Sequence, residues 1–209
     1  MSSTTLLRFH LSSYWRIGSG KGSDAIADAL VLRDSAGLPV IPGRTIKGLL
    51  RDSMKLATLS GSVREESLSR WFGSPLAGTE QNLKDGDEQE IALEKGRFQS
   101  EEGLLWFGSA QLPAAWRKWA KSNPESDVLG ELTAYQSSTA IDKDGVAKEH
   151  SLRVAEVAVP MDLIAEVRGP SDDKQWVQDL KVTLPLLRAL GSRRSRGLGR
   201  VDVTLEESR

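Results

Sequence analysis

Hydrophobic and polar residues alternate near both ends of the chain, in TTLLRFHL (residues 4–11) and in GLGRVDVTL (residues 197–205). One face of this alternation carries Thr5, Leu7, Phe9 and Leu11 in the first segment and Val201, Val203 and Leu205 in the last. A period of two places these residues on one face of an extended chain. We therefore expect a half-buried strand near each end.

Two longer segments change to helical spacing. In RTIKGLLRDSMKLATLSG (residues 44–61) the apolar residues recur three and four positions apart, which predicts an amphipathic helix ending near Gly61. Its apolar face consists of Ile46, Leu49, Leu50, Met54 and Ala57. Residues 172–190 are also helical in pattern, although Pro185 must kink this helix or begin a second one. Gly191 suits the position just beyond its end.

The middle of the chain predicts three more strands. Residues 103–112 read as a buried strand followed by a short helix from Pro113, and residues 152–159 and 161–169 read as two strands separated by Pro160. With the remaining elements taken as long insertions, these segments contain the order strand, helix, strand, strand, helix, strand of the ferredoxin-like α+β fold.

Two insertions have recognisable patterns of their own. Asp144-Gly145 is a hairpin-type turn signal, and residues 78–102 are polar, acidic and short of aromatic residues, which predicts a mobile loop.

Composition narrows the functional classes. The chain has 209 residues, no cysteine, two histidines and a formal net charge of -1. We expect one domain in the cytoplasm, because there is no apolar run long enough to span a membrane and no signal-peptide pattern. A thiolate metal site is excluded, a histidine-rich centre is disfavoured, and any nucleic-acid binding must depend on local basic clusters.

The glycine-rich stretch IGSGKGSDAIAD (residues 17–28) invites comparison with phosphate-binding loops. Gly20-Lys21 is followed by Gly22 and preceded at the required distance by Trp15, so the Walker A spacing fails. The glycines also miss the G-x-G-x-x-G spacing of dinucleotide-binding loops. Two interpretations remain: a flexible surface loop, or a loop whose N–H groups approach a phosphate beside a lysine.

Basic residues gather in two places. On the helix predicted from residue 44 they are spaced along one side, and before the last strand they lie in GSRRSRGLGRV. They are Arg44, Lys47, Arg51 and Lys55 on the helix, and Arg193, Arg194, Arg196 and Arg200 in the loop. The helix residues can form an ordinary solvated face, and the loop arginines can cap a helix end. Cations at a helix N-terminus and guanidinium groups between glycines also suit a bound polyanion.

Three carboxylates lie near the glycine-rich stretch, on Asp24, Asp28 and Asp34. Each is a candidate catalytic group by composition, and a solvated acid at the start of a strand is the more ordinary interpretation. The sequence pattern alone does not rank them.

Three segments resemble the RAMP superfamily of CRISPR-associated RNA-binding proteins. IPGRTIKGLLR is similar to the start of its Pro-Gly-x-x-(Ile/Leu)-Lys-Gly helix, and GSRRSRGLGRV to its C-terminal glycine-rich loop. RIGSGKGSDAIADALVLRDSAGLPVIPG resembles the N-terminal segment of type III backbone subunits, with Arg16 where a histidine is often found.

The resemblance implies a single domain over residues 1–209. Its ferredoxin-like (RRM-like) palm would comprise residues 1–77, 103–136 and 152–209, with the mobile insertion at about 78–102 and a thumb hairpin at about 137–151. Such a subunit binds a CRISPR guide RNA in an effector complex, beside other subunits and stacked head-to-tail copies of itself, and cuts target RNA.

The resemblance also assigns site residues. An aspartate six residues before the aspartate of the Arg33-Asp34 pair is needed for cleavage in type III members, which singles out Asp28, with a divalent ion, Mg²⁺, as cofactor. The residues expected to bind RNA are Arg16, Ser19, Lys21, Arg44, Lys47, Arg51, Arg193, Arg194 and Arg196.

Two other functions of the same superfamily stay open. One is a non-catalytic backbone or capping subunit. The other is a guide-processing ribonuclease, for which His10 and Tyr14 would be the candidate residues.

Overall fold

The computed structural model describes residues 2–20, 22, 27–73 and 101–206 of the chain. Strand β1 (Ser2–Leu11) is central to its main sheet, because it pairs antiparallel with β5 (Met161–Pro170) on one side and β6 (Val201–Glu206) on the other. The two-residue β2 (Trp106–Phe107) pairs antiparallel with β5, which gives the strand order β2-β5-β1-β6. The alternation predicted for β1 is confirmed: Leu7, Phe9 and Leu11 are buried.

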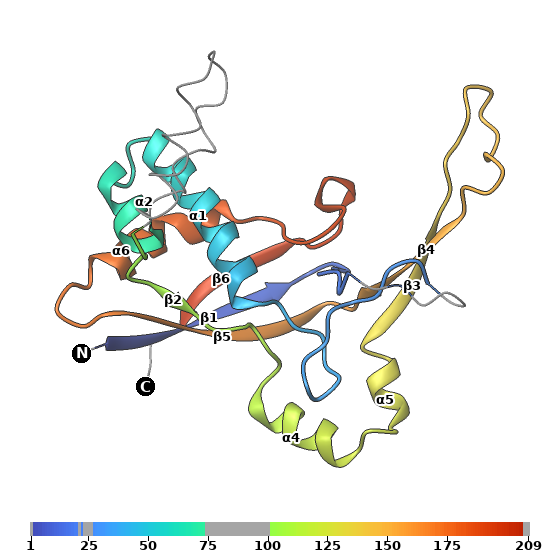
Figure 1. The fold of residues 1–209 in the computed structure, drawn as a ribbon, viewed down its shortest axis with the longest axis horizontal. Coiled ribbons are helices and arrows are strands. Elements are labelled where there is room, and N and C mark those ends of the chain that lie inside the picture. The colour runs from blue at the N-terminus through green and yellow to red at the C-terminus, as the bar shows by residue number, and fades with distance from the viewer. Residues whose placement is uncertain (1, 21, 23–26, 74–100, 207–209) are drawn as a thin grey trace, which may run out of the picture.

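Helices α1 (Gly43–Leu59), α2 (Glu65–Phe72) and α6 (Gln175–Thr183) gather on one side of this sheet (Figure 1). The predicted amphipathic helix is confirmed as α1, which buries Ile46, Leu50 and Met54 and is followed by Gly61 with a φ of 72°. Apolar side chains of the helices and the sheet form a continuous core.

Pro185 does not kink α6; it lies in a separate short helix, which was the second of the two alternatives predicted for it. The α-helix ends at Thr183, and Pro185 lies in a short 3₁₀ helix, η1 (Leu184–Leu186). A second 3₁₀ turn, η2 (Arg194–Arg196), follows Gly191. Gly191 has a left-handed φ of 80°, but the prediction that it directly follows a helix end is wrong, because the last helical residue before it is Leu186 and Ala189 forms a bridge with Arg200.

A hairpin extends from the main sheet and forms a second, two-stranded sheet (Figure 1). Strand β3 (Thr133–Ser138) pairs antiparallel with β4 (Arg153–Ala158), and the chain between them turns at Asp142–Gly145. The Asp142 carboxylate accepts hydrogen bonds from the N–H groups of Asp144 (2.9 Å) and Val146 (3.0 Å). The predicted turn at Asp144-Gly145 is therefore present, with Gly145 at a φ of 81°.

The structure corrects the strand predictions in two places. The strand expected over residues 103–112 is regular only at Trp106–Phe107, because the chain beyond it makes only isolated bridges, at Ala110 and Gln111. Residues 153–158 do not join the main sheet as expected; they pair with β3 instead.

Several elements were not predicted, namely β3, α2 and the single turn α5 (Asp127–Gly130), whereas the helix after Pro113 is confirmed as α4 (Ala114–Ser122). Most of the loop expected at residues 78–102 lies outside the described residues. At the level of class, the mixed helix and antiparallel-sheet architecture agrees with the α+β prediction.

Candidate functional site

Residues 28 and 29 run alongside β4 at the base of the hairpin. The N–H of Asp28 donates to the Val154 carbonyl (2.9 Å), and the N–H of Glu156 donates to the Ala29 carbonyl (2.9 Å). The Asp28 side chain continues this pattern, since its Oδ2 accepts a hydrogen bond from the N–H of Val154 (2.8 Å). Asp28 is exposed, so its carboxylate is fixed by the hairpin and remains accessible to solvent.

Asp34 has a different role from Asp28. Its Oδ1 accepts hydrogen bonds from the N–H groups of Ala36 (2.8 Å) and Leu38 (3.1 Å) and so stabilises the turn at Gly37. Asp24 lies outside the described residues. Of the two acids that the structure describes, Asp28 is therefore the one whose carboxylate is available to a ligand.

Two arginines meet near the same hairpin base. The Arg193 guanidinium donates to the Ser138 hydroxyl at the end of β3 (2.9 Å), and the Arg16 carbonyl accepts from the N–H of Ser192 (2.9 Å). Gly191 is required here, because a Cβ at this position would overlap the Arg16 carbonyl. The C-terminal loop is thereby held against the segment that carries Arg16.

The electrostatics of this pair favour an anion. Partial burial and then the positive charge of Arg193 lower the pKa of the Arg16 guanidinium below its usual value. Among the described residues, no carboxylate forms an ion pair with either arginine. A phosphate placed between them would relieve the repulsion and accept charge-assisted hydrogen bonds from both guanidinium groups.

No contact in the described part of the chain joins the candidate RNA-binding residues on α1 to this cluster, whereas the N–H of Arg196 on η2 donates to the Arg193 carbonyl (2.8 Å). On α1, Arg44 is exposed and Lys47 and Arg51 are partly exposed. The first turn of the helix has no acidic residue, and the N–H of Gly43 donates to the Ser109 hydroxyl (3.3 Å). Arg194 and Arg196 are exposed on η2. The N–H of Ser19 bonds to the Leu30 carbonyl (3.0 Å), and Lys21 lies outside the described residues.

A divalent cation at Asp28 would depend on ligands from a nucleic acid. The described residues contain no group of three histidine, aspartate or glutamate side chains that could hold a metal. Mg²⁺ commonly takes only one or two protein carboxylates together with phosphate oxygens and water. The exposed Asp28 carboxylate, with one oxygen hydrogen-bonded, fits that kind of site.

Sequence reasoning missed the partners of these groups, namely Ser138, Val154 and Glu156. The bonds that Ser138 accepts and that Val154 donates join segments far apart in the chain, for which the sequence gives no signal. Glu156 did carry a signal in the sequence, since it is an acidic residue in the apolar run RVAEVAV. The structure shows that it is buried.

His10 and Tyr14, the residues considered for guide processing, do not form a joint site. His10 is exposed on β1, and its Nδ1 lies 2.7 Å from Oδ1 of Asp162. Tyr14 is 45% exposed, and no contact among the described residues joins the two side chains.

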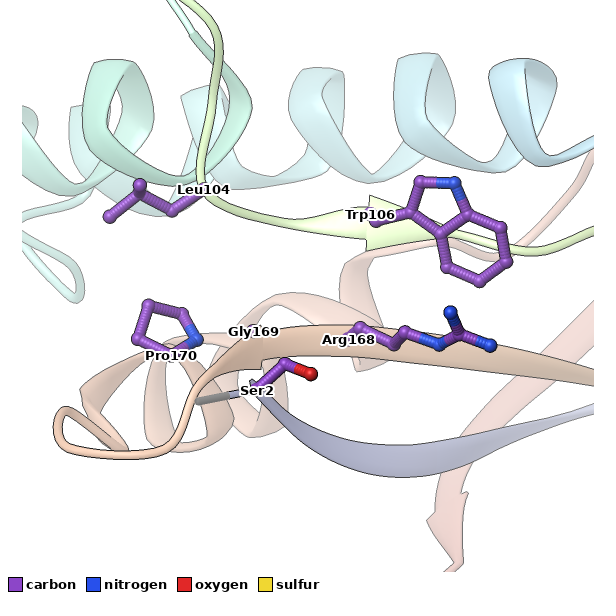
Figure 2. A pocket seen from close by; sticks show the side chains of 6 residues that line it. All are labelled: Ser2, Leu104, Trp106, Arg168, Gly169 and Pro170. Carbon is purple, nitrogen blue, oxygen red and sulfur yellow. The ribbon is translucent and has the colours of Figure 1, made fainter.

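A groove of about 460 Å³ lies apart from these residues, near the start of β1 and the end of β5 (Figure 2). Ser2, Leu104, Trp106, Arg168, Gly169 and Pro170 line it. The Arg168 guanidinium stacks 4.6 Å from the centre of the Trp106 ring and forms an ion pair with Glu166 (2.9 Å). None of the predicted site residues lines this groove.

Comparison with known proteins places the chain in a family. The RAMP superfamily model matches residues 8–202, and the chain therefore belongs to the RAMP superfamily. No curated protein sequence matches the chain significantly.

Two solved structures share the fold. One is described as a cryo-EM structure of the Type III-B Cmr-beta bound to cognate target RNA; its similar chain has 12% sequence identity and a TM-score of 0.64, with 97% of each chain covered. The other is described as the apo state of Type III-B Cmr-beta, with 12% identity, a TM-score of 0.62 and 98% of each chain covered. Among the described helices, none is long and apolar enough to cross a membrane.

Proposed function

We propose that this chain is a guide-RNA-binding backbone subunit of a type III CRISPR effector complex and that it cuts target RNA complementary to the guide. Membership of the RAMP superfamily and a fold similar to chains of the type III-B Cmr-beta structures support this assignment. One of those structures is described as bound to cognate target RNA, which is the substrate class proposed here.

The architecture is interpreted accordingly. The sheet β2-β5-β1-β6 with α1 and α6 would be the ferredoxin-like palm, and the β3–β4 hairpin would be the thumb. Sequence specificity would come from base pairing between guide and target, while the protein holds the backbone.

Guide phosphates would bind at the basic residues. Arg16 and Arg193, close together without an acidic partner in the described structure, would hold one phosphate between their guanidinium groups. Arg44, Lys47 and Arg51 would contact further phosphates along α1, whose first turn carries no acidic residue. Arg194 and Arg196 would contribute from the exposed η2 turn.

The observation that carries the proposed cleavage is the position of Asp28. Its carboxylate is exposed, yet it is fixed to the base of the hairpin through Val154. The hairpin would separate a guide–target base pair and present the target backbone to Asp28, which would orient the 2′-hydroxyl or the leaving group. Mg²⁺ bound by Asp28 and RNA phosphate oxygens would stabilise negative charge at the phosphate.

Replacing Asp28 tests this function. Asp28→Asn retains a side-chain oxygen that accepts the Val154 hydrogen bond but loses the charge, whereas Asp28→Ala loses both. In complexes reconstituted with guide RNA, we expect both variants to bind guide and matched target normally and to leave the target uncut opposite this subunit. Cleavage by Asp28→Asn at the wild-type rate would refute a catalytic role of Asp28.

A non-catalytic backbone subunit is the second candidate, and the Val154–Asp28 hydrogen bond favours it, because it gives the carboxylate a structural task. In that case the wild-type complex would leave the target intact at this position. Guide processing is a weaker third candidate, and cleavage of free CRISPR repeat RNA by the isolated chain would revive it.

A further inference from the structure

We infer that the ion pair between Arg33 and Glu156 is a positioning element that fixes Asp28 relative to the hairpin. This inference deepens the proposed function and rests on it. Neither side chain would touch RNA; both would act through the segment that carries Asp28.

Glu156 is the centre of this arrangement. Its side chain is 6% exposed although it lies in the apolar strand β4, and both carboxylate oxygens have partners. Oε1 accepts from the Arg33 guanidinium (2.7 Å), and Oε2 accepts from the N–H of Val31 (2.8 Å). A buried carboxylate needs such partners, since an uncompensated charge in the core is strongly unfavourable.

Arg33 extends the contact to two more segments. One guanidinium nitrogen donates to the Gly37 carbonyl (2.9 Å), and the nitrogen that binds Glu156 also donates to the Thr133 hydroxyl (3.1 Å). Thr133 lies on β3 and Glu156 on β4. One ion pair therefore joins the segment after Asp28 to both strands of the hairpin.

The contacts of Asp28 and of this pair lie along the same strand. Asp28 bonds to Val154, Ala29 pairs with Ala155, and Val31 and Arg33 bond to Glu156. The Asp28–Val154 interaction lies at the exposed end of this row of contacts, and the ion pair lies at its buried end. Losing the ion pair would allow residues 28–31 to move away from β4 and take the carboxylate with them.

The arrangement has a consequence for the proposed reaction. Because Asp28 is tied to β4, any shift of the hairpin base on binding a guide–target duplex would move Asp28 with it. The carboxylate would therefore keep its position relative to the RNA backbone that the hairpin displaces. Displacement of a positioned group by about 1 Å can cost about 100-fold in rate.

The test uses Glu156→Gln, which keeps the shape and the acceptor for Val31 but removes the charge that pairs with Arg33. Arg33→Lys is a conservative companion that retains the charge and loses the fork-shaped contact with Thr133 and Gly37. Glu166→Gln is the matched control, since it breaks another Glu–Arg pair, with Arg168, at the exposed surface of the sheet.

Two measurements are made. In the reconstituted complex, single-turnover target cleavage opposite this subunit is measured together with the affinities for guide and target. In the full-length chain alone, amide hydrogen exchange is measured at Asp28, Val31 and Val154.

We expect Glu156→Gln to slow cleavage about 10- to 100-fold at unchanged affinities and to accelerate exchange at all three amides. The cleavage and exchange rates of Arg33→Lys should lie between those of Glu156→Gln and wild type, and those of Glu166→Gln should match wild type. A general loss of stability would instead lower the affinities too and speed exchange throughout the main sheet. Wild-type rates and exchange in Glu156→Gln would overturn the inference.

Failure of the proposed function gives a different result. If the wild-type complex leaves the target uncut opposite this subunit, the cleavage assignment is wrong. The exchange measurement then decides separately whether Arg33 and Glu156 hold Asp28, and unchanged exchange in Glu156→Gln would refute that as well.

Discussion

Arg193 combines two properties that do not favour the stability of the free protein. Its φ of 58° is in the left-handed region, which is uncommon for residues other than glycine. Its charge adds to the repulsion that lowers the pKa of Arg16. Costs of this kind tend to persist where a ligand uses the strained group.

We therefore expect Arg193→Gly to separate stability from RNA binding. The free energy of unfolding should change by less than about 1 kcal/mol, because the left-handed conformation that glycine adopts readily and the loss of the Arg16 repulsion offset the lost hydrogen bond to Ser138. Guide RNA affinity should fall by roughly 10-fold or more through loss of a charge-assisted phosphate contact. Urea denaturation and a filter-binding titration measure the two quantities.

Arg193→Asn is the control for this prediction. Asparagine tolerates the left-handed region and also lacks the charge, so it should weaken RNA binding as much as glycine does. If asparagine preserved the affinity, added loop flexibility would explain the glycine result and the phosphate role would be wrong.

At the scale of residues, the sequence identified candidate site residues but not the distant residues that hold them in place. Asp28 and Asp34 have similar local surroundings in the sequence, and only the family resemblance distinguished them. The structure separates them because Asp34 caps its own turn through local bonds, whereas Asp28 bonds to a strand more than 120 residues away in the chain. No local pattern predicts a partner at that distance.

At the scale of elements, α1 contains two glycines with opposite structural consequences. A Cβ on Gly43, at its first turn, would overlap the carbonyl of Phe107, whereas a Cβ on Gly48 would meet no atom within 4 Å. Gly43 thus allows the helix to begin directly against the β2 segment. Gly48 lies on an exposed part of the helix and has no such role in the described structure.

We expect Gly43→Ala to lower the free energy of unfolding by about 1–3 kcal/mol, because the backbone must move to admit the methyl group. Gly48→Ala should raise it by roughly 0.5–1 kcal/mol, since alanine is the better helix former. Both values can be read from urea denaturation. Equal effects of the two substitutions would contradict the close packing of α1 against residue 107.

The basic side of α1 makes a separate prediction. If Lys47 and Arg51 contact guide phosphates, changing both to Gln should weaken guide binding for every sequence and reduce the salt dependence of the logarithm of affinity by about 0.7 per lost contact. Binding is titrated at several salt concentrations. Changing Lys118 and Lys121 on α4 to Gln removes the same charge elsewhere and should leave the slope unaltered; equal slopes in both variants would refute the phosphate contacts.

Prediction of the elements succeeded where one face is buried over several residues, as in β1, α1 and β6. It failed for β3, whose residues are exposed or only partly buried, so that no alternating pattern marks them. It also misassigned β4, because its apolar residues are equally compatible with pairing in the main sheet. Which strand partners another is decided by packing that the sequence pattern does not reveal.

At the scale of the whole molecule, the hairpin divides into a base and a tip with different roles. The base carries the bonds to Asp28 and Arg193, through Val154 and Ser138. The tip, residues 139–152, is almost entirely exposed and includes the apolar side chains of Ile141 (69%) and Val146 (62%). The fold does not depend on these side chains, so their exposure would suit the contact with a guide–target duplex proposed above.

Replacing residues 139–152 by Asn-Gly tests this division. Ser138 and Arg153 form a cross-strand pair, and a two-residue Asn-Gly turn can join such a pair. We expect the thermal midpoint of unfolding to change by less than about 4 °C, since little buried surface is removed. Guide affinity should also stay close to wild type, because the arginines and α1 are untouched.

Target cleavage should nevertheless be lost in this variant. Without the tip, the hairpin would no longer separate a guide–target base pair, so the target backbone would not be presented to Asp28. The measurement is single-turnover cleavage with guide and target binding followed in parallel. Cleavage at the wild-type rate would show that the base of the hairpin alone presents the target, and would assign the apolar tip to some other contact within the assembly.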